Sequence, residues 1–451
     1  MKRLPLVLIL TIALALRLVN AFLIPWQGGD MVVSDMQGYD RAAVALLEQQ
    51  PLSVHTAERY LFHPLGSDTY HPPAYYYFLA GVYAIAGHSY LAVRIVQAVL
   101  DTLTCFIIYC IGKGVFGYRA GRLAAAVAAV YPPLIFYTGV LLTETLSTCL
   151  LAGATWLLLD SGQFAVGSSQ LAVSSNKALS TPSHKLMLGG LLLGLAALTR
   201  SVLLLIAPVA VLWHWFIAKT FGTHPETPKA SKVRYALVLM LSVGLVIAPI
   251  TLRNYQIHHR FVLISTNGGV NFFLGHGGSE RLKNQVRNIP PTYSAGQLIG
   301  ISSRTEPEEE AYFYRLGWNY VREHPWRVLR SLPGKFVQMY WDSDYWPATD
   351  AQASILRAID LVLWKLLLLP LSLLGWLMWH AETRRRAALL YLVLLCSSCI
   401  PLLFWAQTRF RMPFVPYFIV LAAGAATEAL GRLTSHGRTD RDRAVIGGIA
   451  S

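Results

Sequence analysis

Long apolar runs constrain this chain more than any other feature. Runs such as Leu4–Ile24, Tyr235–Leu252 and Ile355–Trp379 are interrupted by few charged residues. A bilayer core about 30 Å thick is spanned by roughly 20 helical residues, so several runs are long enough to cross it. Hydrophobic residues make up 54% of the 451 positions and charged residues only 14%, with a mean hydropathy of +0.45. Such runs cannot all be buried in one water-soluble core, and the chain is expected to be an all-α polytopic membrane protein.

The distribution of Lys and Arg predicts the orientation of about ten transmembrane helices, with a range of about 9 to 12. The candidate spans are 4–25, 90–111, 120–137, 141–159, 186–200, 201–218, 235–252, 355–379, 386–405 and 413–431. Basic clusters then fall on the inner side, at Lys113, Arg119, Arg122, Lys177, Lys185, Lys219, Lys229, Lys232, Arg234, Arg384, Arg385, Arg386, Arg432, Arg438, Arg441 and Arg443. The segment 26–70 is acidic instead, which places it outside.

The segment Pro72–Gly87 is apolar but is not counted as a crossing. It is short for a span, and counting it would place the later basic clusters outside. Its tyrosines suit the headgroup level, so we expect a helix that lies along the outer interface or re-enters there.

The predicted organisation has five parts. Residues 1–252 form a transmembrane module that includes a first outer loop at 26–89 and a flexible Ser-rich inner linker at 161–185. Residues 253–350 form a large outer loop after the seventh crossing. Its second half is expected to be two amphipathic helices separated at Pro325. Residues 351–432 are C-terminal transmembrane helices, and 433–451 are a basic, disordered tail.

The N-terminus and the cysteines narrow the class further. Lys2 and Arg3 precede an apolar run that exceeds a signal-peptide core and lacks a small-residue cleavage site, so it predicts a retained first helix. The cysteines fall in apolar runs, which argues against a disulfide framework; Cys396 and Cys399 are expected to pack inside a helix. The net charge of +14 comes from loop clusters that set topology, so it does not indicate nucleic-acid binding.

Asp35 is the first candidate catalytic residue. It follows the first helix, where an ionised carboxylate at the mouth of an apolar cavity could take a proton from an acceptor. The alternative is that Asp35 or Asp40 caps a helix at 39–50, and Asp40 is expected to have this capping role.

Glu144 is the second candidate. It opens a predicted span on the same outer side, and an acid at that depth requires a cation or a polar ligand. It could orient a substrate or be the structural partner of a buried arginine.

Arginines on the outer side stand out because the positive-inside rule disfavours them there. These are Arg200, Arg253, Arg409 and Arg411. A guanidinium contacts phosphate oxygens at two points, and a phosphate leaving group requires such stabilisation. The alternative is snorkelling to lipid headgroups at helix ends. Several together favour an anionic lipid substrate.

The sequence offers no firm cofactor. His71, before Pro72-Pro73, is a candidate substrate-binding residue, although a lone histidine is more often a surface or capping residue. There is no HExxH, no paired CxxC and no glycine-rich nucleotide loop. No metal site is predicted, and a divalent metal has no support from the sequence. A transferase without a nucleotide site must take its sugar from another activated donor.

Several short motifs together resemble the bacterial branch of glycosyltransferase family 39 in the GT-C superfamily, which includes protein O-mannosyltransferases and lipid A aminoarabinose transferases. The matching pieces run along nearly the whole chain: Ser34-Asp35 with Tyr39 and Ala42-Ala43; His71-Pro72-Pro73-Ala74-Tyr75-Tyr76-Tyr77; Arg94 and Gln97; Leu142-Thr143-Glu144 after Pro132-Pro133; Leu198-Thr199-Arg200; Pro249 through Arg253-Asn254-Tyr255; Ile264 through Asn267-Gly268-Gly269, with Asn271 and Leu274-Gly275; and Arg409-Phe410-Arg411-Met412-Pro413.

The resemblance implies a GT-C fold with seven conserved crossings, interfacial helices in the first outer loop and a mixed outer loop after the seventh crossing. It implies inverting transfer from a polyprenyl-phosphate-linked sugar to a lipid, glycan or protein acceptor, at the periplasmic face of a bacterial inner membrane. Asp35 matches the family's first-loop catalytic aspartate and Glu144 its second-loop acid. His71, Arg200, Arg253, Asn267, Arg409 and Arg411 are then candidates for substrate or phosphate binding. Met36 departs from the pattern, because family members often place a second acid directly after the first.

Two other classes remain open. A transporter or flippase for a lipid-linked saccharide would typically show internal repeats, and we find none. A surface polysaccharide polymerase or ligase shares the lipid-phosphate donor chemistry.

Overall fold

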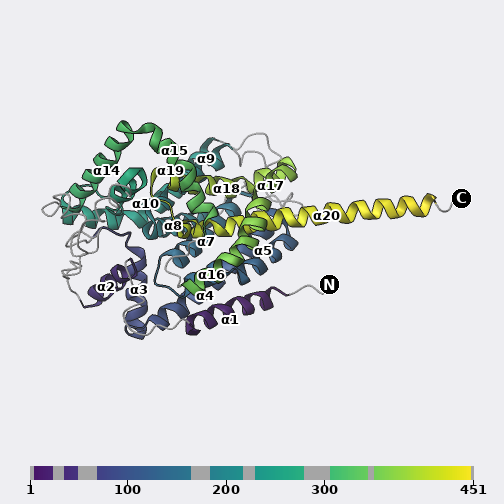
Figure 1. Cartoon of the computed structure of the whole chain (residues 1–451), viewed down its shortest axis with the longest axis horizontal. Helices are drawn as coiled ribbons and strands as arrows, with labels where there is room; N and C mark the ends of the chain where they lie inside the picture. Colours follow the sequence, from purple (N-terminus) through teal and green to yellow (C-terminus); the bar gives the residue numbers. More distant parts are fainter. Residues whose placement is uncertain are drawn as a thin grey trace.

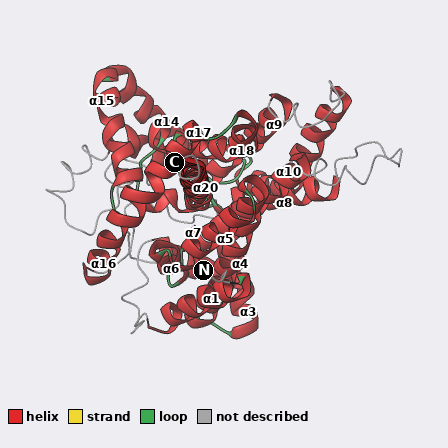
Figure 2. Cartoon of the chain, turned by 90° about the vertical axis from the view of Figure 1, so that its right-hand side faces the viewer, coloured by secondary structure: helices red, strands yellow, loops and turns green. Residues whose placement is uncertain are grey.

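The computed structural model describes residues 5–23, 35–48, 69–163, 183–216, 229–278, 305–343 and 350–447. Within these ranges Figure 2 shows helices and connecting loops, and no strand. The predicted all-α class is therefore confirmed.

The helices form one bundle with smaller helices at one end (Figure 1). In the first part of the chain they are α1 (Leu6–Leu23), α2 (Asp35–Leu47), α3 (Ala74–Ala86), α4 (Tyr90–Phe116), α5 (Tyr118–Val130), α6 (Pro132–Thr138), α7 (Glu144–Gln163), α8 (Ser183–Thr199), η2 (Ser201–Leu205), α9 (Ile206–Phe216) and α10 (Lys229–His258). In the second part they are α11 (Gly268–Phe273), η4 (Leu274–Gly278), α14 (Glu306–Glu323), α15 (Pro325–Phe336), η5 (Val337–Trp341), α16 (Asp350–Asp360), η6 (Leu361–Leu368), α17 (Leu369–Met378), α18 (Ala381–Ser397), α19 (Cys399–Leu403), η7 (Thr408–Phe414) and α20 (Val415–Gly447).

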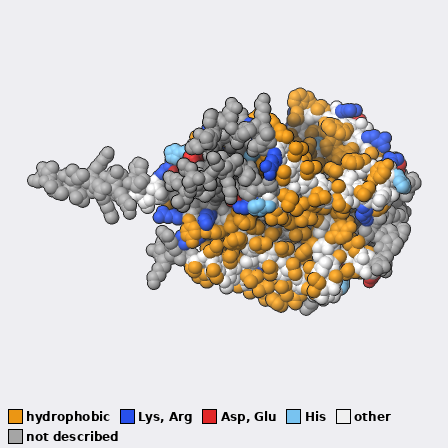
Figure 3. Space-filling view, turned by 180° about the vertical axis from the view of Figure 1, so that it is seen from behind, with side chains coloured by type: hydrophobic (Ala, Val, Ile, Leu, Met, Phe, Trp, Pro, Cys, Tyr) orange, Lys and Arg blue, Asp and Glu red, His pale blue; other side chains and the backbone are white. Residues whose placement is uncertain are grey.

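The multi-pass membrane character is confirmed. Six helical segments of the described chain are long and apolar enough to span a bilayer, and α5 with α6, bent by 54°, makes a seventh if the pair is one span. The helices α7, α8 and η2–α9 also lie in the predicted spans at 141–159, 186–200 and 201–218, from Glu144, up to Thr199 and up to Phe216 respectively. Helix α8 and the η2–α9 segment are shorter than a bilayer requires. Figure 3 shows the corresponding apolar surface across the middle of the body.

The smaller helices mark one end of the bundle. The N and C termini lie at one end, and α2, α3 and α14 lie at the other (Figure 1). We call this other end the pocket end, because the cavity described below is located there.

Helix α3 begins and ends at the pocket end, as the non-crossing prediction requires. His71, just before α3, lines the cavity. After α3, the first turns of α4 contact the same end: Arg94 donates to the carbonyl of Ala21 at 3.0 Å, and Gln97 donates to that of Val140 at 2.9 Å. The 13 residues of α3 are also too few to cross.

A buried ion pair holds α1 against α4 and α5 in the middle of the bundle. Arg17 donates to Asp101 at 2.6 Å, and the two side chains are 0% and 1% exposed. Arg17 also donates to the carbonyls of Ala128 and Ala129 in α5. Charge at this depth requires such complete pairing. Helices α4 and α5 approach closely because position 121 is glycine: a Cβ there would lie 2.7 Å from the Tyr109 carbonyl oxygen.

The predicted amphipathic pair in the large outer loop is confirmed. Helix α14 begins with a capping box between Thr305 and Glu308, and Pro325 starts α15. Most of the predicted 161–185 linker lies outside the described residues, as does the loop between η4 and α14.

The prediction of a disordered tail at 433–451 is wrong for the described part. Helix α20 continues to Gly447 and projects from the body (Figure 1). This stretch lacks proline and keeps Arg and Ala, which favour helix, so the helix that starts in the bundle propagates outward.

Candidate active site

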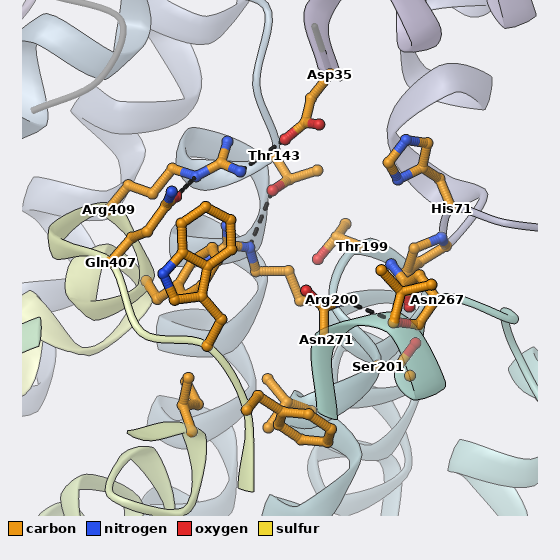
Figure 4. A pocket seen from close by; sticks show the side chains of 18 of the residues that line it. Asp35, His71, Thr143, Thr199, Arg200, Ser201, Asn267, Asn271, Gln407 and Arg409 are labelled. Carbon is orange, nitrogen blue, oxygen red and sulfur yellow. Dashed lines mark hydrogen bonds and ion pairs between the residues drawn. The ribbon is translucent and has the colours of Figure 1, made fainter. Parts of the chain in front are cut away.

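A cavity of about 770 Å³ opens at the pocket end of the bundle (Figure 4). Segments from across the chain line it: Asp35 and Tyr39 of α2; the stretch Tyr70-His71-Pro72; Leu142-Thr143; Thr199 to Val202; Asn267, Gly268, Val270, Asn271 and Leu274; and Ile400, Phe404, Trp405, Gln407, Arg409 and Phe410. Three residues predicted from the outer-side charges and motifs, namely Asp35, Arg200 and Arg409, thus meet in one place.

Asp35 lies at the start of α2 and faces Arg409 across the cavity (Figure 4). Its Oδ2 accepts a hydrogen bond from the Arg409 guanidinium at 2.6 Å. Arg409 Nε in turn donates to Gln407 Oε1 at 2.8 Å, which fixes the plane of the guanidinium. The Asp35 side chain is 26% exposed, so it remains open to a molecule in the cavity.

Glu144 acts on the cavity through Arg200. Arg200 donates to Glu144 Oε1 at 2.9 Å and to Thr143 Oγ1 at 3.0 Å. Glu144 is only 1% exposed and does not line the cavity, whereas Arg200 does. Of the two roles left open by the sequence, the geometry matches the structural partner of an arginine.

Phe410 lies between the two cavity arginines. The guanidinium carbons of Arg200 and Arg409 are 5.2 and 5.3 Å from its ring centroid. An aromatic face stabilises nearby cations and excludes water around them. The two guanidiniums are therefore held near each other in a partly apolar environment, where an anion would be bound strongly.

His71 and Asn267 lie on the wall opposite Arg409 (Figure 4). The His71 ring packs against Tyr39 and Tyr70, with centroids 4.9 Å apart in both cases. Burial and the Asp35 charge raise the pKa of both phenols above its usual value of 10, so they stay neutral.

The segment that carries Asn267 approaches α14 closely. A Cβ at Gly269 would lie 2.2 Å from the Glu310 carbonyl oxygen, so only glycine fits there. Asn271 Nδ2 donates to the Asn267 carbonyl at 2.9 Å, which stabilises the turn. Both asparagines consequently face the cavity.

The prediction that Arg411 binds phosphate does not agree with the structure. Arg411 is 0% exposed, donates to both oxygens of Asp360 at 3.0 Å and stacks over Trp364. It does not line the cavity, whereas Arg409 does. Arg253, near the end of α10, also lies outside the cavity lining and donates to Asn254 Oδ1 at 3.4 Å.

The capping role expected for Asp40 is wrong. Helix α2 begins at Asp35, so Asp40 lies within it. Its carboxylate accepts hydrogen bonds from Tyr83 at 2.6 Å and Tyr90 at 3.0 Å, and lies 2.8 Å from His88 Nε2. Asp40 therefore ties α2 to α3 and α4. Spacing alone could not show this, because the partners follow more than 40 positions later in the chain.

The apolar wall was missed by sequence reasoning. Ile400, Phe404 and Trp405 line the cavity below the arginines, and Trp405 N donates to the Asn271 carbonyl at 3.2 Å. In the sequence they are indistinguishable from the end of a lipid-facing helix. Phe410 could have been recognised from the sequence, because it lies between Arg409 and Arg411. Among the described residues, no three His, Cys, Asp or Glu side chains are grouped so that they could hold a metal ion.

Comparisons with known proteins identify a family model that matches part of the chain and solved structures with a similar fold. Residues 70–250 match the family model described as dolichyl-phosphate-mannose-protein mannosyltransferase. No curated protein matches the sequence. The oligosaccharyltransferase of Archaeoglobus fulgidus superposes with a TM-score of 0.57 at 16% identity, over 98% of this chain and 52% of that one. The same enzyme with an inhibitory peptide and a dolichol-phosphate gives 0.57 at 17% identity, over 97% and 52%.

A third structure, ArnT from Cupriavidus metallidurans bound to undecaprenyl phosphate, gives a TM-score of 0.39 at 14% identity, over 95% of this chain and 78% of that one. The chain spans about half the length of the oligosaccharyltransferase. As the sequence motifs predicted, residues 70–250 resemble a mannosyltransferase family, and the chain has the same fold as the oligosaccharyltransferase.

Proposed function

We propose that this chain is a glycosyltransferase that moves a sugar from a polyprenyl-phosphate-linked donor to an acceptor, with inversion at the anomeric carbon. The observation that carries the proposal is the meeting of Asp35, Arg200 and Arg409 in one cavity, at the pocket end of a membrane bundle. The match of 70–250 to mannosyltransferases that use a dolichyl-phosphate sugar supports the same chemistry.

Asp35 is the proposed general base. As the bond between the anomeric carbon and the phosphate oxygen breaks, the acceptor oxygen or nitrogen bonds to that carbon from the opposite face. The acceptor proton passes to Asp35, and the polyprenyl phosphate leaves with the bonding electrons. The geometric requirement is a carboxylate within reach of the cavity interior, and Asp35 meets it at the rim.

Arg409 and Arg200 are the proposed phosphate-binding residues. Charge that develops on the leaving phosphate is stabilised by preorganised donors in a water-poor site. In the structure both arginines are paired with carboxylates, Arg409 with Asp35 and Arg200 with Glu144. A donor phosphate would share Arg409 with Asp35, and the weakened ion pair would leave Asp35 a stronger base.

We propose that the isoprenoid chain of the donor binds along the apolar wall. Ile400, Phe404 and Trp405 lie beside the arginines and continue toward the lipid-facing part of α19, where Leu402 and Leu403 are exposed. A lipid tail placed there would keep its phosphate next to Arg200. The oligosaccharyltransferase with the same fold was solved with a dolichol-phosphate, which supports this class of donor.

The transferred group is proposed to be a hexose or pentose, and the acceptor a lipid, glycan or protein. We further propose that the cavity faces the periplasm from a bacterial inner membrane, since the basic loop clusters belong to the other side. Met36 directly after Asp35 disfavours the protein-mannosylating subtype, whose members often have a second acid at that place.

The test begins with mass spectrometry of glycolipids and glycoproteins from cells with and without the protein, which identifies the product. Transfer is then measured for the purified Asp35→Asn variant. We expect kcat to fall by about 100-fold or more, the usual range for loss of a general base, with binding of undecaprenyl phosphate retained.

Asp40→Asn is the matched control, because its carboxylate is on the same helix but outside the cavity. It should keep most of the activity. Full activity of Asp35→Asn would remove Asp35 from the mechanism. Movement of a lipid-linked saccharide across the membrane without a new glycosidic bond would support a flippase instead.

A further inference from the structure

Glu306, the first residue of α14, forms a buried hydrogen-bond cluster outside the cavity. Its Oε2 accepts from the backbone N–H of Thr69 at 3.2 Å, from the Thr69 hydroxyl, and from the Thr266 hydroxyl at 3.1 Å. Glu306 is 6% exposed, and the two threonines are 2% exposed. A single buried carboxylate oxygen thus accepts three hydrogen bonds.

Three more contacts complete this cluster. The backbone N–H of Thr266 donates to the Thr69 carbonyl at 2.9 Å, so the two chain segments are also joined directly. His258 Nε2, near the end of α10, lies 2.9 Å from Thr69 Oγ1 and 3.9 Å from Glu306 Oε2. The cluster therefore links the first outer loop, α10, the segment before α11 and α14.

The two threonines sit directly before two walls of the cavity. Thr69 precedes the lining stretch Tyr70-His71-Pro72, and Thr266 precedes Asn267 and Gly268. These stretches are far apart in the sequence, and Glu306 is the side chain that binds both. Glu306 itself does not line the cavity. Its effect on a bound substrate must therefore pass through the positions of the two walls.

The walls joined by Glu306 contact the arginine side of the cavity through the Ser201–Ser265 hydroxyl pair at 2.9 Å and through Trp405 N, which donates to the Asn271 carbonyl at 3.2 Å. The side chains that hold Arg200 and Arg409 are Glu144, Asp35 and Gln407, and none of them belongs to the Glu306 cluster. Loss of the cluster should therefore shift His71 and Asn267 more than the two arginines.

We propose that Glu306 is a positioning residue, which clamps the His71 wall to the Asn267 wall and so sets the orientation of the sugar relative to Asp35. This inference rests on the proposed function, in which the cavity is the site of sugar transfer. A displacement of about 1 Å in reacting groups costs about 100-fold in rate. The clamp is therefore expected to act on kcat more than on donor binding.

The first experiment compares kinetics of Glu306→Ala and Glu306→Gln with those of Glu308→Gln. Glu308 is the matched control, because it is on the same turn, is 39% exposed and pairs with Arg260 at the surface. We expect kcat to fall about 10- to 100-fold for Glu306→Ala and less for Glu306→Gln, which keeps an acceptor oxygen. The donor KM and the affinity for undecaprenyl phosphate should stay within about twofold for all three variants.

An engineered disulfide gives a stricter test. The Thr69 and Thr266 hydroxyls both donate to Glu306 Oε2, and the Thr266 N–H donates to the Thr69 carbonyl, so a cysteine pair at these two positions is the covalent replacement for the clamp. The triple variant Glu306→Ala, Thr69→Cys, Thr266→Cys should regain most of the lost kcat when oxidised and lose it again when reduced. A verified disulfide that leaves kcat low would overturn the proposal, as would unchanged kcat in Glu306→Ala.

Hydrogen exchange tests the clamp even if the protein transfers no sugar, and so separates this inference from the proposed function. In Glu306→Ala, amides of the 259–278 and 69–76 segments should exchange faster than in the wild type, and in Glu308→Gln they should not. Unchanged exchange in Glu306→Ala would show that Glu306 does not hold the walls together.

Discussion

Arg409 and Arg411 stand two positions apart in η7 and have different surroundings. Arg409 lines the cavity and pairs with Asp35, whereas Arg411 is fully buried against Asp360 and Trp364. In the sequence both are outer-side arginines with the same expected role. What separates them is the partner that each meets after folding, and only one of these partners lies at the cavity.

This difference predicts opposite phenotypes. Arg411→Met should reduce stability by about 3–5 kcal/mol, because it leaves Asp360 as a buried unpaired charge. Arg409→Met should destabilise less, since its partner is partly exposed, but should lower transfer by about 100-fold or more. Thermal unfolding in detergent and a transfer assay measure the two effects. Adding Asp360→Leu to Arg411→Met should restore part of the stability; if it does not, Arg411 is not held mainly by Asp360.

At the scale of single elements, helix α14 links the 253–350 segment to the walls of the cavity. Its capping box fixes where it begins, and its first two turns direct Glu306 to the two threonines and Glu310 to Gly268 and Gly269. The sequence analysis predicted two helices separated at Pro325. It predicted neither the capping box nor the contacts of these carboxylates, because an acidic first turn is expected for any helix.

Glu310 predicts a pH dependence of stability. Burial raises its pKa from the usual 4.5 to about 7, against the opposing effect of the Gly269 and Gly268 amides, and the nearby Glu306 charge adds to the rise. An acid whose pKa is higher in the folded state stabilises the fold below pH 4.5, and this contribution is lost as pH rises toward 7. Tyr314, the other titratable neighbour, stays neutral there because its pKa is raised to about 12.

Thermal unfolding of the wild type and Glu310→Gln between pH 5 and pH 8 measures this effect. Relative to Glu310→Gln, the wild type should lose stability as pH rises across this range. Glu308→Gln serves as the control, since Glu308 is partly exposed and paired with Arg260. Parallel pH profiles for the wild type and Glu310→Gln would contradict a raised pKa at Glu310.

At the scale of the whole molecule, the bundle has two ends joined by an apolar body (Figure 3). The cavity, α2, α3 and α14 occupy one end, and the termini occupy the other (Figure 1). The same fold occurs in an oligosaccharyltransferase at 16% identity. Such a likeness can persist because a bilayer demands apolar spans and charge asymmetry but not particular side chains.

The orientation predicts which residues are reachable from each side of the membrane. In a variant without native cysteines, Arg260→Cys should react with a membrane-impermeant maleimide added to the outside of spheroplasts. Arg385→Cys, at an exposed position near the start of α18, should react only after permeabilisation. The reverse pattern would place the cavity on the cytoplasmic side.

The sequence by itself determined the membrane class, the approximate spans, the non-crossing α3 and the break at Pro325. These depend on run length, charge position and proline, which act locally. It also selected Asp35, Arg200 and Arg409, because a charged group at the end of an apolar run is costly wherever it lies.

Only the tertiary structure decided which charges meet. The pairs Arg17–Asp101, Arg200–Glu144 and Arg411–Asp360 join residues more than 50 positions apart. The Glu306 clamp and the apolar wall at Phe404 and Trp405 could not be predicted from the sequence either. Their energies come from burial and from partners brought by other helices, and neither is encoded in the local pattern of the chain.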